Sequence, residues 1–270
     1  MKRYSIFHPL ILSFFSKSLY RDVGQNWRGT GLLYLLVVLA LVWIPTIIKG
    51  QLGLSRWVDG ESKEITTQIP AITISKGQVS TDVPMPYLIK DPKNGTEIAI
   101  IDTTGEYETL ENTNAKFLLT KSKLIASRNA SETRSYDLSG VESFYVDRPL
   151  VESWLVTLRR LFIPVFYPLA LIFSFIFRAI QVLVYALIGL LFARMLNANL
   201  DFKSLMRLAA ISITPVLILN LLFEFLPVRI PGWTLIGIII ALAYLFLAVK
   251  VNTEPEGPAE YLPPPPYPTV

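Results

Sequence analysis

Gly31–Ile48 reads GLLYLLVVLALVWIPTII and Trp233–Val249 reads WTLIGIIIALAYLFLAV, and neither stretch contains a charged residue. About 18 uncharged apolar residues are enough for a helix to cross a hydrocarbon core roughly 30 Å thick. The whole chain is 52% hydrophobic with a mean hydropathy of +0.46, and its apolar residues are gathered in long runs. We therefore expect an α-helical polytopic membrane protein.

The mostly apolar run Leu161–Phe192 decides the number of spans. It would form one helix about 48 Å long at roughly 1.5 Å per residue, or two short spans. With one span, nine basic residues lie near the cytoplasmic ends of the spans and six near the outer ends, whereas with two spans the numbers become seven and nine. Basic residues favour the cytoplasmic side, so we expect one long helix, tilted or bent at Pro164 and Pro168. The four expected transmembrane helices are 31–49, 155–196, 204–226 and 233–250.

The N-terminal segment, residues 1–30, carries five basic residues against one acidic residue, Asp22, and is therefore expected in the cytoplasm. Within it, Ile6–Tyr20 is apolar and aromatic, which predicts an amphipathic, interfacial helix on the cytoplasmic leaflet. The alternative is that Ile6–Tyr20 forms the first turns of a long helix leading into the first span. No small-residue cleavage site follows the first apolar run, so we expect that run to be a retained span.

Residues 50–150 contain short β-prone runs separated by turn residues such as Asp91–Gly95, since Asn and Gly tolerate positive φ. The predicted strands are Ile65–Ile69, Ala71–Ser75, Pro86–Lys90, Glu97–Asp102, Lys116–Thr120 and Lys123–Ser127. We expect an inserted small β-rich extracytoplasmic domain between the first two spans. Residues 51–154 hold 11 basic and 15 acidic residues, so the basic isoelectric point of about 9.2 comes from the membrane flanks. This charge distribution argues against nucleic-acid binding.

The chain has no cysteine and one histidine, His8, which removes thiol chemistry and schemes with several histidines. We expect no catalytic residue, no metal and no cofactor. One motif, Asp102–Gly105 (DTTG), allows a catalytic interpretation. It resembles the strand end at which aspartic proteases present their carboxylate. Here an extra Thr interrupts the Asp-Thr-Gly pattern. Aspartic protease chemistry also needs two carboxylates, and the chain contains no second such motif. Asp102 and Thr103 are therefore expected to form a strand-end turn, with contact to an anion or a partner as the alternative.

Arg178 and Gln181 interrupt the longest apolar run. A charged side chain inside a membrane costs at least about 2.5 kcal/mol on insertion scales. If Arg194 marks the inner boundary, Arg178 lies about 24 Å further out along the helix, where its charge can reach the outer interface. The alternative is a contact with a lipid head group or a partner helix. Glu224, near the outer end of the third span, is the candidate partner side chain for Arg178.

Residues 251–270 form a proline-rich tail that we expect to be cytoplasmic and disordered. Pro264, Pro265 and Tyr267 make a Pro-Pro-x-Tyr pattern, which would dock on an aromatic groove in polyproline II conformation. The alternative for these residues is a plain solvated tail.

Several stretches carry a family resemblance. They are Ser13–Val23 (SFFSKSLYRDV), Trp27–Gly29 (WRG), Tyr34-Leu35, Ile98–Gly105 (IAIIDTTG), and Leu118–Ile125 (LLTKSKLI) followed by Glu132, Arg134, Tyr136 and Asp137. They resemble a bacterial membrane-protein family known as domain of unknown function 1189, over most of residues 10–250. Asp201–Leu205 (DFKSL) and Ile213–Pro215 (ITP) are also similar to the Yip (Ypt-interacting protein) superfamily. The second resemblance implies a helical bundle with a proline-containing span, and neither resemblance implies a reaction.

The expected function is that of a non-enzymatic scaffold, assembly or modulatory subunit of a bacterial envelope complex. It would lie in the lipid bilayer of the inner membrane with both termini cytoplasmic, and would contact a membrane-protein partner or a second copy. One alternative is a small permease or an accessory subunit of a transporter, with Arg178, Gln181 and Glu224 as candidate lining groups. The other is a membrane hydrolase that uses Asp102.

Overall fold

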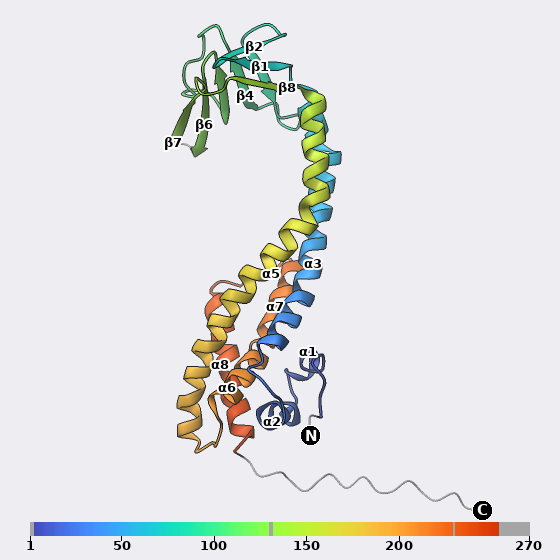
Figure 1. Cartoon of the computed structure of the whole chain (residues 1–270), viewed down its shortest axis with the longest axis vertical. Helices are drawn as coiled ribbons and strands as arrows, with labels where there is room; N and C mark the ends of the chain where they lie inside the picture. The colour runs from blue at the N-terminus through green and yellow to red at the C-terminus, as the bar shows by residue number, and fades with distance from the viewer. Residues whose placement is uncertain (1–2, 130–131, 229, 254–270) are drawn as a thin grey trace, which may run out of the picture. The chain divides into compact units, whose positions relative to one another are not determined.

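The computed structural model describes residues 3–129, 132–228 and 230–253, and the chain divides into two compact units (Figure 1). Unit 1 comprises Met1–Ile47 and Val165–Val270, and unit 2 comprises Ile48–Pro164. Two long helices, α3 (Leu32–Asp59) and α5 (Arg148–Met195), have one end in each unit. Each unit has a hydrophobic core of its own.

Within the described residues, four helices are long and apolar enough to cross a membrane, which confirms the expected number of apolar helices. They are Leu32–Thr66, Arg148–Met195, Phe202–Phe225 and Trp233–Val251. The run Leu161–Phe192 lies in one continuous helix, α5, which also contains Pro164 and Pro168. The third helix is divided into α6 (Phe202–Ser212) and α7 (Thr214–Phe225), because Pro215 has no N–H with which to continue the hydrogen-bond ladder. The fourth is α8 (Trp233–Val251).

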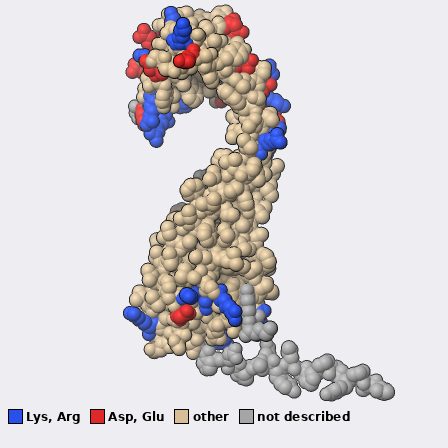
Figure 2. Space-filling model, viewed as in Figure 1, with Lys and Arg blue, Asp and Glu red and all other residues tan. Residues whose placement is uncertain are grey.

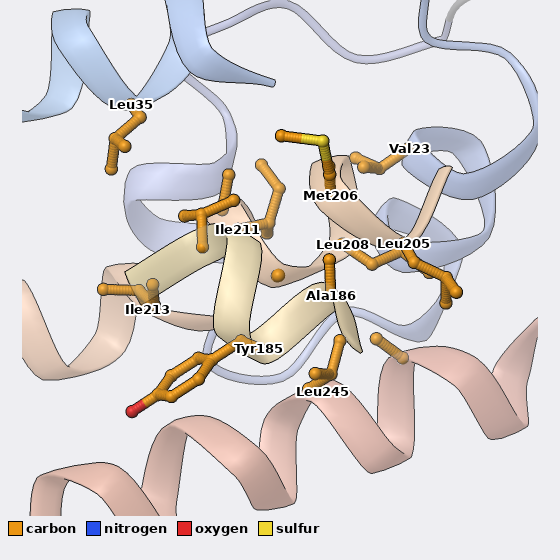
Figure 3. Packing of buried hydrophobic residues seen from close by; sticks show 14 of the residues in the cluster. Val23, Leu35, Tyr185, Ala186, Leu205, Met206, Leu208, Ile211, Ile213 and Leu245 are labelled. Carbon is orange, nitrogen blue, oxygen red and sulfur yellow. The ribbon is translucent and has the colours of Figure 1, made fainter. Parts of the chain in front are cut away.

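Unit 1 is built around α6, in which every residue from Ser204 to Ser212 is buried. Figure 3 shows its side chains meeting Val23 of α2 (Lys17–Gln25), Leu35 of α3, Ala186 of α5 and Leu245 of α8. Small residues on α5 allow this approach: a Cβ placed on Gly189 would lie 3.4 Å from the Leu205 side chain. In a membrane, close packing of this kind replaces the hydrophobic effect as the main attraction between helices.

The N-terminal segment differs from the single interfacial helix predicted over Ile6–Tyr20, and it does not run into α3. It forms α1 (Pro9–Leu12) and α2, which begins after Ser16 because the Ser16 hydroxyl accepts a hydrogen bond from the Leu19 N–H at 3.2 Å. Leu19 and Val23 are fully buried against α6 and α8. The exposed apolar side chains around α1 are Phe7, Ile11 and Phe15. Half of the segment therefore belongs to the helical core.

Unit 2 contains the predicted β-rich domain. Its elements are α4 (Glu61–Thr66), β1 (Ile72–Ser75), β2 (Gln78–Thr81), β3 (Tyr87–Lys90), β4 (Glu97–Asp102), β5 (Phe117–Thr120), β6 (Lys123–Asn129), β7 (Glu132–Asp137) and β8 (Ser143–Val146). One sheet has the order β2-β1-β8 and the other β3-β4-β5-β6-β7. All pairs are antiparallel except β4 with β5, which places Asp102 opposite Thr120. Ile74 of β1 and Ile101 of β4 share one buried cluster, so the two sheets pack on a common core.

The predicted strand Ile65–Ile69 is wrong. The first long helix extends to Asp59, and α4 follows it, so the β-rich part begins at Ile72 and not at residue 50. Two glutamates in the first turn of α4 favour a helix start, since the helix dipole is positive there. Likewise α5 begins at Arg148, ahead of the predicted 155, because the Asp147 carboxylate accepts a hydrogen bond from the Leu150 N–H at 3.0 Å.

Candidate functional site

A series of polar side chains lies on one face of α5, within its apolar stretch. Arg178, Gln181 and Tyr185 are three and four residues apart, a spacing that aligns them along a helix. Arg178 Nη1 donates to Gln181 Oε1 at 2.5 Å, and Gln181 Nε2 donates to the Tyr185 hydroxyl at 2.9 Å. Tyr185 is buried in the core of unit 1. The guanidinium of Arg178 is therefore oriented by groups that are themselves fixed.

Two cavities, of about 200 and about 160 Å³, adjoin this series, and Arg178 and Asn220 line both of them. The larger cavity lies among α5, α7 and α8 and is also lined by Gln181 and Trp233. The smaller lies among α3, α5 and α7. Its further polar groups are Thr46, Ser174 and Glu224. Helices far apart in the sequence thus enclose the polar residues that interrupt the apolar spans.

The smaller cavity contains one basic and one acidic side chain. Glu224 Oε2 accepts a hydrogen bond from Thr46 Oγ1 at 2.7 Å. Among the described residues, the ion pairs do not include one between Arg178 and Glu224, although both line the same cavity. The two side chains line the same cavity, and their partnership stays a prediction.

The level of the cavities in the bundle follows from Trp233. This residue begins α8, and its Nε1 donates to Asn220 Oδ1. Its ring packs edge-on against Phe223 with the ring centroids 4.7 Å apart. Tryptophan concentrates at membrane–water interfaces. Arg178 and Glu224 therefore lie toward the end of the helical unit where α7 finishes and α8 starts.

Asp102, the candidate from the DTTG motif, is fully buried at the end of β4. Its Oδ1 accepts from the Thr104 N–H at 2.8 Å and from Thr104 Oγ1 at 2.6 Å, and its Oδ2 accepts from the Tyr107 N–H at 2.6 Å. Burial alone would raise the pKa of Asp102, but these hydrogen bonds lower it below its usual range. Thr103 is half-buried in the same turn. The carboxylate closes a turn, and this geometry adds no support to the hydrolase hypothesis.

The edges of the two sheets in unit 2 differ in how they are covered. The side chain of Gln68 covers β3 at Lys90, with hydrogen bonds of 2.9 Å to both its N–H and its C=O. The outer side of β2 is joined to a loop by a bond from the Val79 N–H to the Lys121 carbonyl at 2.8 Å. Strand β7 carries three charged residues, a common protection of sheet edges. Strand β8 reads Ser-Phe-Tyr-Val, is uncharged, and pairs within the described residues with β1 alone.

The sequence interpretation missed a second polar cluster in unit 1, which is centred on Arg207. Arg207 is 7% exposed and donates to the carbonyls of Val23, Gly24 and Gly29 and to Ser204 Oγ, at 2.6 to 3.0 Å. Two of these carbonyls belong to the last turn of α2, where helical partners are lacking. Figure 2 shows the visible Lys and Arg side chains of unit 1 gathered at the end that carries α2.

The carboxylate of Asp22 joins α2 to the residues before α1 and to the residues that follow α2. It accepts from the N–H groups of Arg3 and Tyr4, from Asn26 Nδ2 and from Trp27 Nε1, at 3.0 to 3.1 Å. Burial would raise its pKa, but these donors lower it. Three residues could have pointed to this cluster in the sequence: Gly29 and Gly31, whose φ angles are positive in the structure, and Asp201, which caps α6.

The predicted tail motif, Pro264, Pro265 and Tyr267, lies outside the described residues.

Comparisons with known proteins place the chain in a family. The model of a family described as protein of unknown function, DUF1189, matches residues 7–249. An uncharacterized protein of Rickettsia prowazekii (strain Madrid E) is 25% identical over 131 residues, and the match covers 44% of this chain and 45% of the length of that relative. No solved structure matches. The likeness to the Yip superfamily stays a prediction, whereas the match over most of the chain shows that it belongs to the DUF1189 family.

Proposed function

We propose that the protein is a non-enzymatic scaffold, assembly or modulatory subunit of an envelope complex in the bacterial inner membrane. The four apolar helices support its insertion in a membrane. The five basic residues in residues 1–30 and the acidic character of residues 51–154 support cytoplasmic termini and an extracytoplasmic β-rich part. In this role the β-rich part contacts a partner protein, and the helices retain it at the membrane.

The observation that carries the proposal is the uncovered edge of β8. Phe144 and Tyr145 are 43% and 52% exposed, and the strand has no charged residue to discourage pairing. Proteins normally protect such edges, as this chain does at its other three. An exposed strand edge gives a partner a row of main-chain donors and acceptors, and alternate side chains supply specificity. We infer that the partner adds an extended segment beside β8.

The test uses a matched pair of aromatic residues on two edge strands. Tyr145 on β8 and Tyr136 on β7 are 52% and 50% exposed. A photo-crosslinking amino acid placed at Tyr145 should give a discrete adduct with another envelope protein in living cells, whereas one at Tyr136 should not. Tyr145→Lys, which puts a charge on β8, should abolish partner recovery in mild detergent, and Tyr136→Lys on the already charged β7 should not. Equal adducts at the two positions, or recovery unaffected by Tyr145→Lys, would refute the proposal.

The intramembrane cavities favour a second candidate, an accessory subunit of a transporter or a small permease. Cavities of about 200 and 160 Å³ are smaller than the roughly 300–1,000 Å³ of most small-molecule sites, so a complete pathway would need a partner protein. Solute uptake that is lost in Arg178→Ala while expression and partner recovery are normal would support this candidate over the scaffold.

A further inference from the structure

The part of the N-terminal segment that lies outside the helical core has an inverted pattern of burial. Pro9 and Ser13 are buried, although they are small or polar. The exposed residues are the large apolar ones, Phe7, Ile11 and Phe15, at 57%, 69% and 69%. The N–H groups of residues 10–16 donate to carbonyls three or four residues earlier, so the helical spacing continues beyond α1. Residues four apart share one face of a helix, and this segment therefore presents three large apolar side chains together.

Hydrogen bonds from two tyrosines fix the orientation of this apolar face. The Tyr20 hydroxyl of α2 donates to the Ser13 carbonyl at 2.6 Å, and Tyr20 is itself buried. The Tyr244 hydroxyl of α8 donates to the Phe14 carbonyl at 3.1 Å. Both carbonyls directly follow α1. Helices α2 and α8 thus hold the face in one position on unit 1, with its apolar side chains outward.

Helix α8 gives the depth of this face in a membrane. With 19 residues, α8 is about 29 Å long, which matches a hydrocarbon core of roughly 30 Å. Tyr244 lies seven residues before Val251, the last residue of α8, so its contact with Phe14 is about 10 Å inside that end. Interfacial amphipathic helices lie with the apolar face about 5–10 Å into the boundary between head groups and acyl chains. The face around α1 therefore lies at the depth expected for contact with acyl chains just below the head groups.

The charges near this face suit an anionic membrane surface. Asp22 is the only acidic residue in residues 1–30, and its carboxylate is buried and hydrogen-bonded within the fold. Lys17 and Arg28 of the same segment are exposed, as is Lys250 in the last turn of α8. The ion pairs among the described residues include none of these three. A basic residue near a membrane with anionic lipids contributes about a fivefold gain in binding, because the surface potential is negative.

We propose that the N-terminal segment is an anionic-lipid contact site of the cytoplasmic leaflet. Phe7, Ile11 and Phe15 insert among the acyl chains, while Lys17 and Arg28 bind phospholipid head groups that carry a phosphate and no ammonium. The site rests on the membrane insertion proposed above, but it is independent of the β8 interface. Substitutions on β8 should therefore leave the lipid contact unchanged.

The first test measures the depth of Ile11 in the full chain, which contains no cysteine of its own. Ile11→Cys carries a fluorophore, and the protein is reconstituted in phosphatidylcholine vesicles with a nitroxide quencher near the lipid head group. The fluorophore at residue 11 should be strongly quenched. One at Gln25→Cys should be quenched weakly, because Gln25 is exposed and follows Gly24, which packs against Asn252 at the end of α8.

A third label separates the outcomes. Ile239 is 59% exposed in α8, and a fluorophore at Ile239→Cys should be quenched by a nitroxide deep in the acyl chains if α8 spans the membrane. Weak quenching at residue 11 beside strong quenching at residue 239 would overturn the lipid contact and leave the proposed function standing. Weak quenching at both positions would overturn membrane insertion, and with it both proposals.

Lys17→Gln tests the choice of lipid, in vesicles of equal parts phosphatidylcholine and phosphatidylglycerol. The nitroxide is placed on one lipid or the other, and the ratio of quenching at residue 11 measures the local enrichment. Phosphatidylglycerol should be enriched around the parent protein, and Lys17→Gln should lower its enrichment about fivefold. Lys121→Gln, which removes an exposed lysine of unit 2, should not. Equal quenching by the two lipids in the parent, or an equal fall in both variants, would overturn the assignment of an anionic lipid to this segment.

Discussion

The docking of the N-terminal segment on the helical bundle depends on Arg207, and Arg207→Ala tests this dependence. The substitution removes the side-chain donors to the carbonyls of Val23 and Gly29, while the Gly24 carbonyl keeps a bond from Ser204 Oγ at 3.0 Å. A buried acceptor left without a partner costs about 1–3 kcal/mol, so two such carbonyls cost about 2–6 kcal/mol. The bond to Gly29 is only partly buried, which places the expected loss at about 2–4 kcal/mol.

The loss should appear as local opening of α2, and the absence of cysteine from the chain makes it measurable. Val23 is fully buried against α6, and Val23→Cys changes its volume little. Maleimide should label this cysteine slowly in the parent protein. In the Arg207→Ala background, a loss of about 2–4 kcal/mol should accelerate labelling by about 30- to 700-fold. Arg207→Lys should give an intermediate rate, because a lysine keeps the charge but not the planar fork.

A control variant and two possible results test whether the hydrogen bonds of Arg207 hold α2 in place. Arg194→Ala removes an exposed arginine from the last turn of α5 and should leave the labelling rate of the Val23→Cys protein unchanged. If Arg207→Ala labels no faster than its parent, the hydrogen bonds of Arg207 do not hold α2. If both arginine variants label equally fast, the effect is one of general charge, and the reasoning from unsatisfied carbonyls is refuted.

Three further predictions concern other parts of the chain. Gly77→Ala should destabilise unit 2 by about 1–3 kcal/mol in thermal unfolding, since φ is +76° and a Cβ would lie 2.7 Å from the Ser139 backbone, whereas Gly140→Ala, with open space around it, should be neutral. The lowered pKa of Asp102 implies stability that is present above about pH 4 and lost as the pH falls through that lowered pKa, so hydrogen exchange in residues 102–107 should rise there and not in Asp102→Asn. Tyr34→Phe should cost about 0.5–1.5 kcal/mol of unfolding free energy, because it removes a buried bond of 2.6 Å to Thr214.

Features that depend on local sequence could be predicted. The apolar runs together with the distribution of basic residues predicted the number of long helices. Strand β4 was expected with the bounds it has, Glu97–Asp102, because the apolar run Ile98–Ile101 that ends in a turn is a strong local pattern. Strands β2, β7 and β8 were missed because most of their residues are exposed and show no apolar pattern. The helical stretch after residue 50 was missed because loss of hydrophobicity was taken as the end of a helix, although charged residues are good helix formers.

The polar contacts of unit 1 could be predicted in part. Arg178 and Gln181 stood out because they interrupt an apolar run, and Glu224 was paired with Arg178 from estimated depth alone. The network around Arg207 could not be found in this way, because its partners on α2 and the following loop are 178 to 184 residues away. A charged residue in a basic cluster near a span end looks the same whether it faces water or caps another helix.

Two arginines of the helical bundle, Arg207 and Arg178, differ in how many hydrogen bonds the fold provides for them. Arg207 donates to three carbonyls and a hydroxyl, so the cost of burying its charge is offset within the fold. Arg178 has one such partner among the described residues and lies beside two cavities. Substitution of Arg207 should therefore lower the stability of unit 1. Substitution of Arg178 should lower stability less, because fewer hydrogen bonds are lost with this side chain.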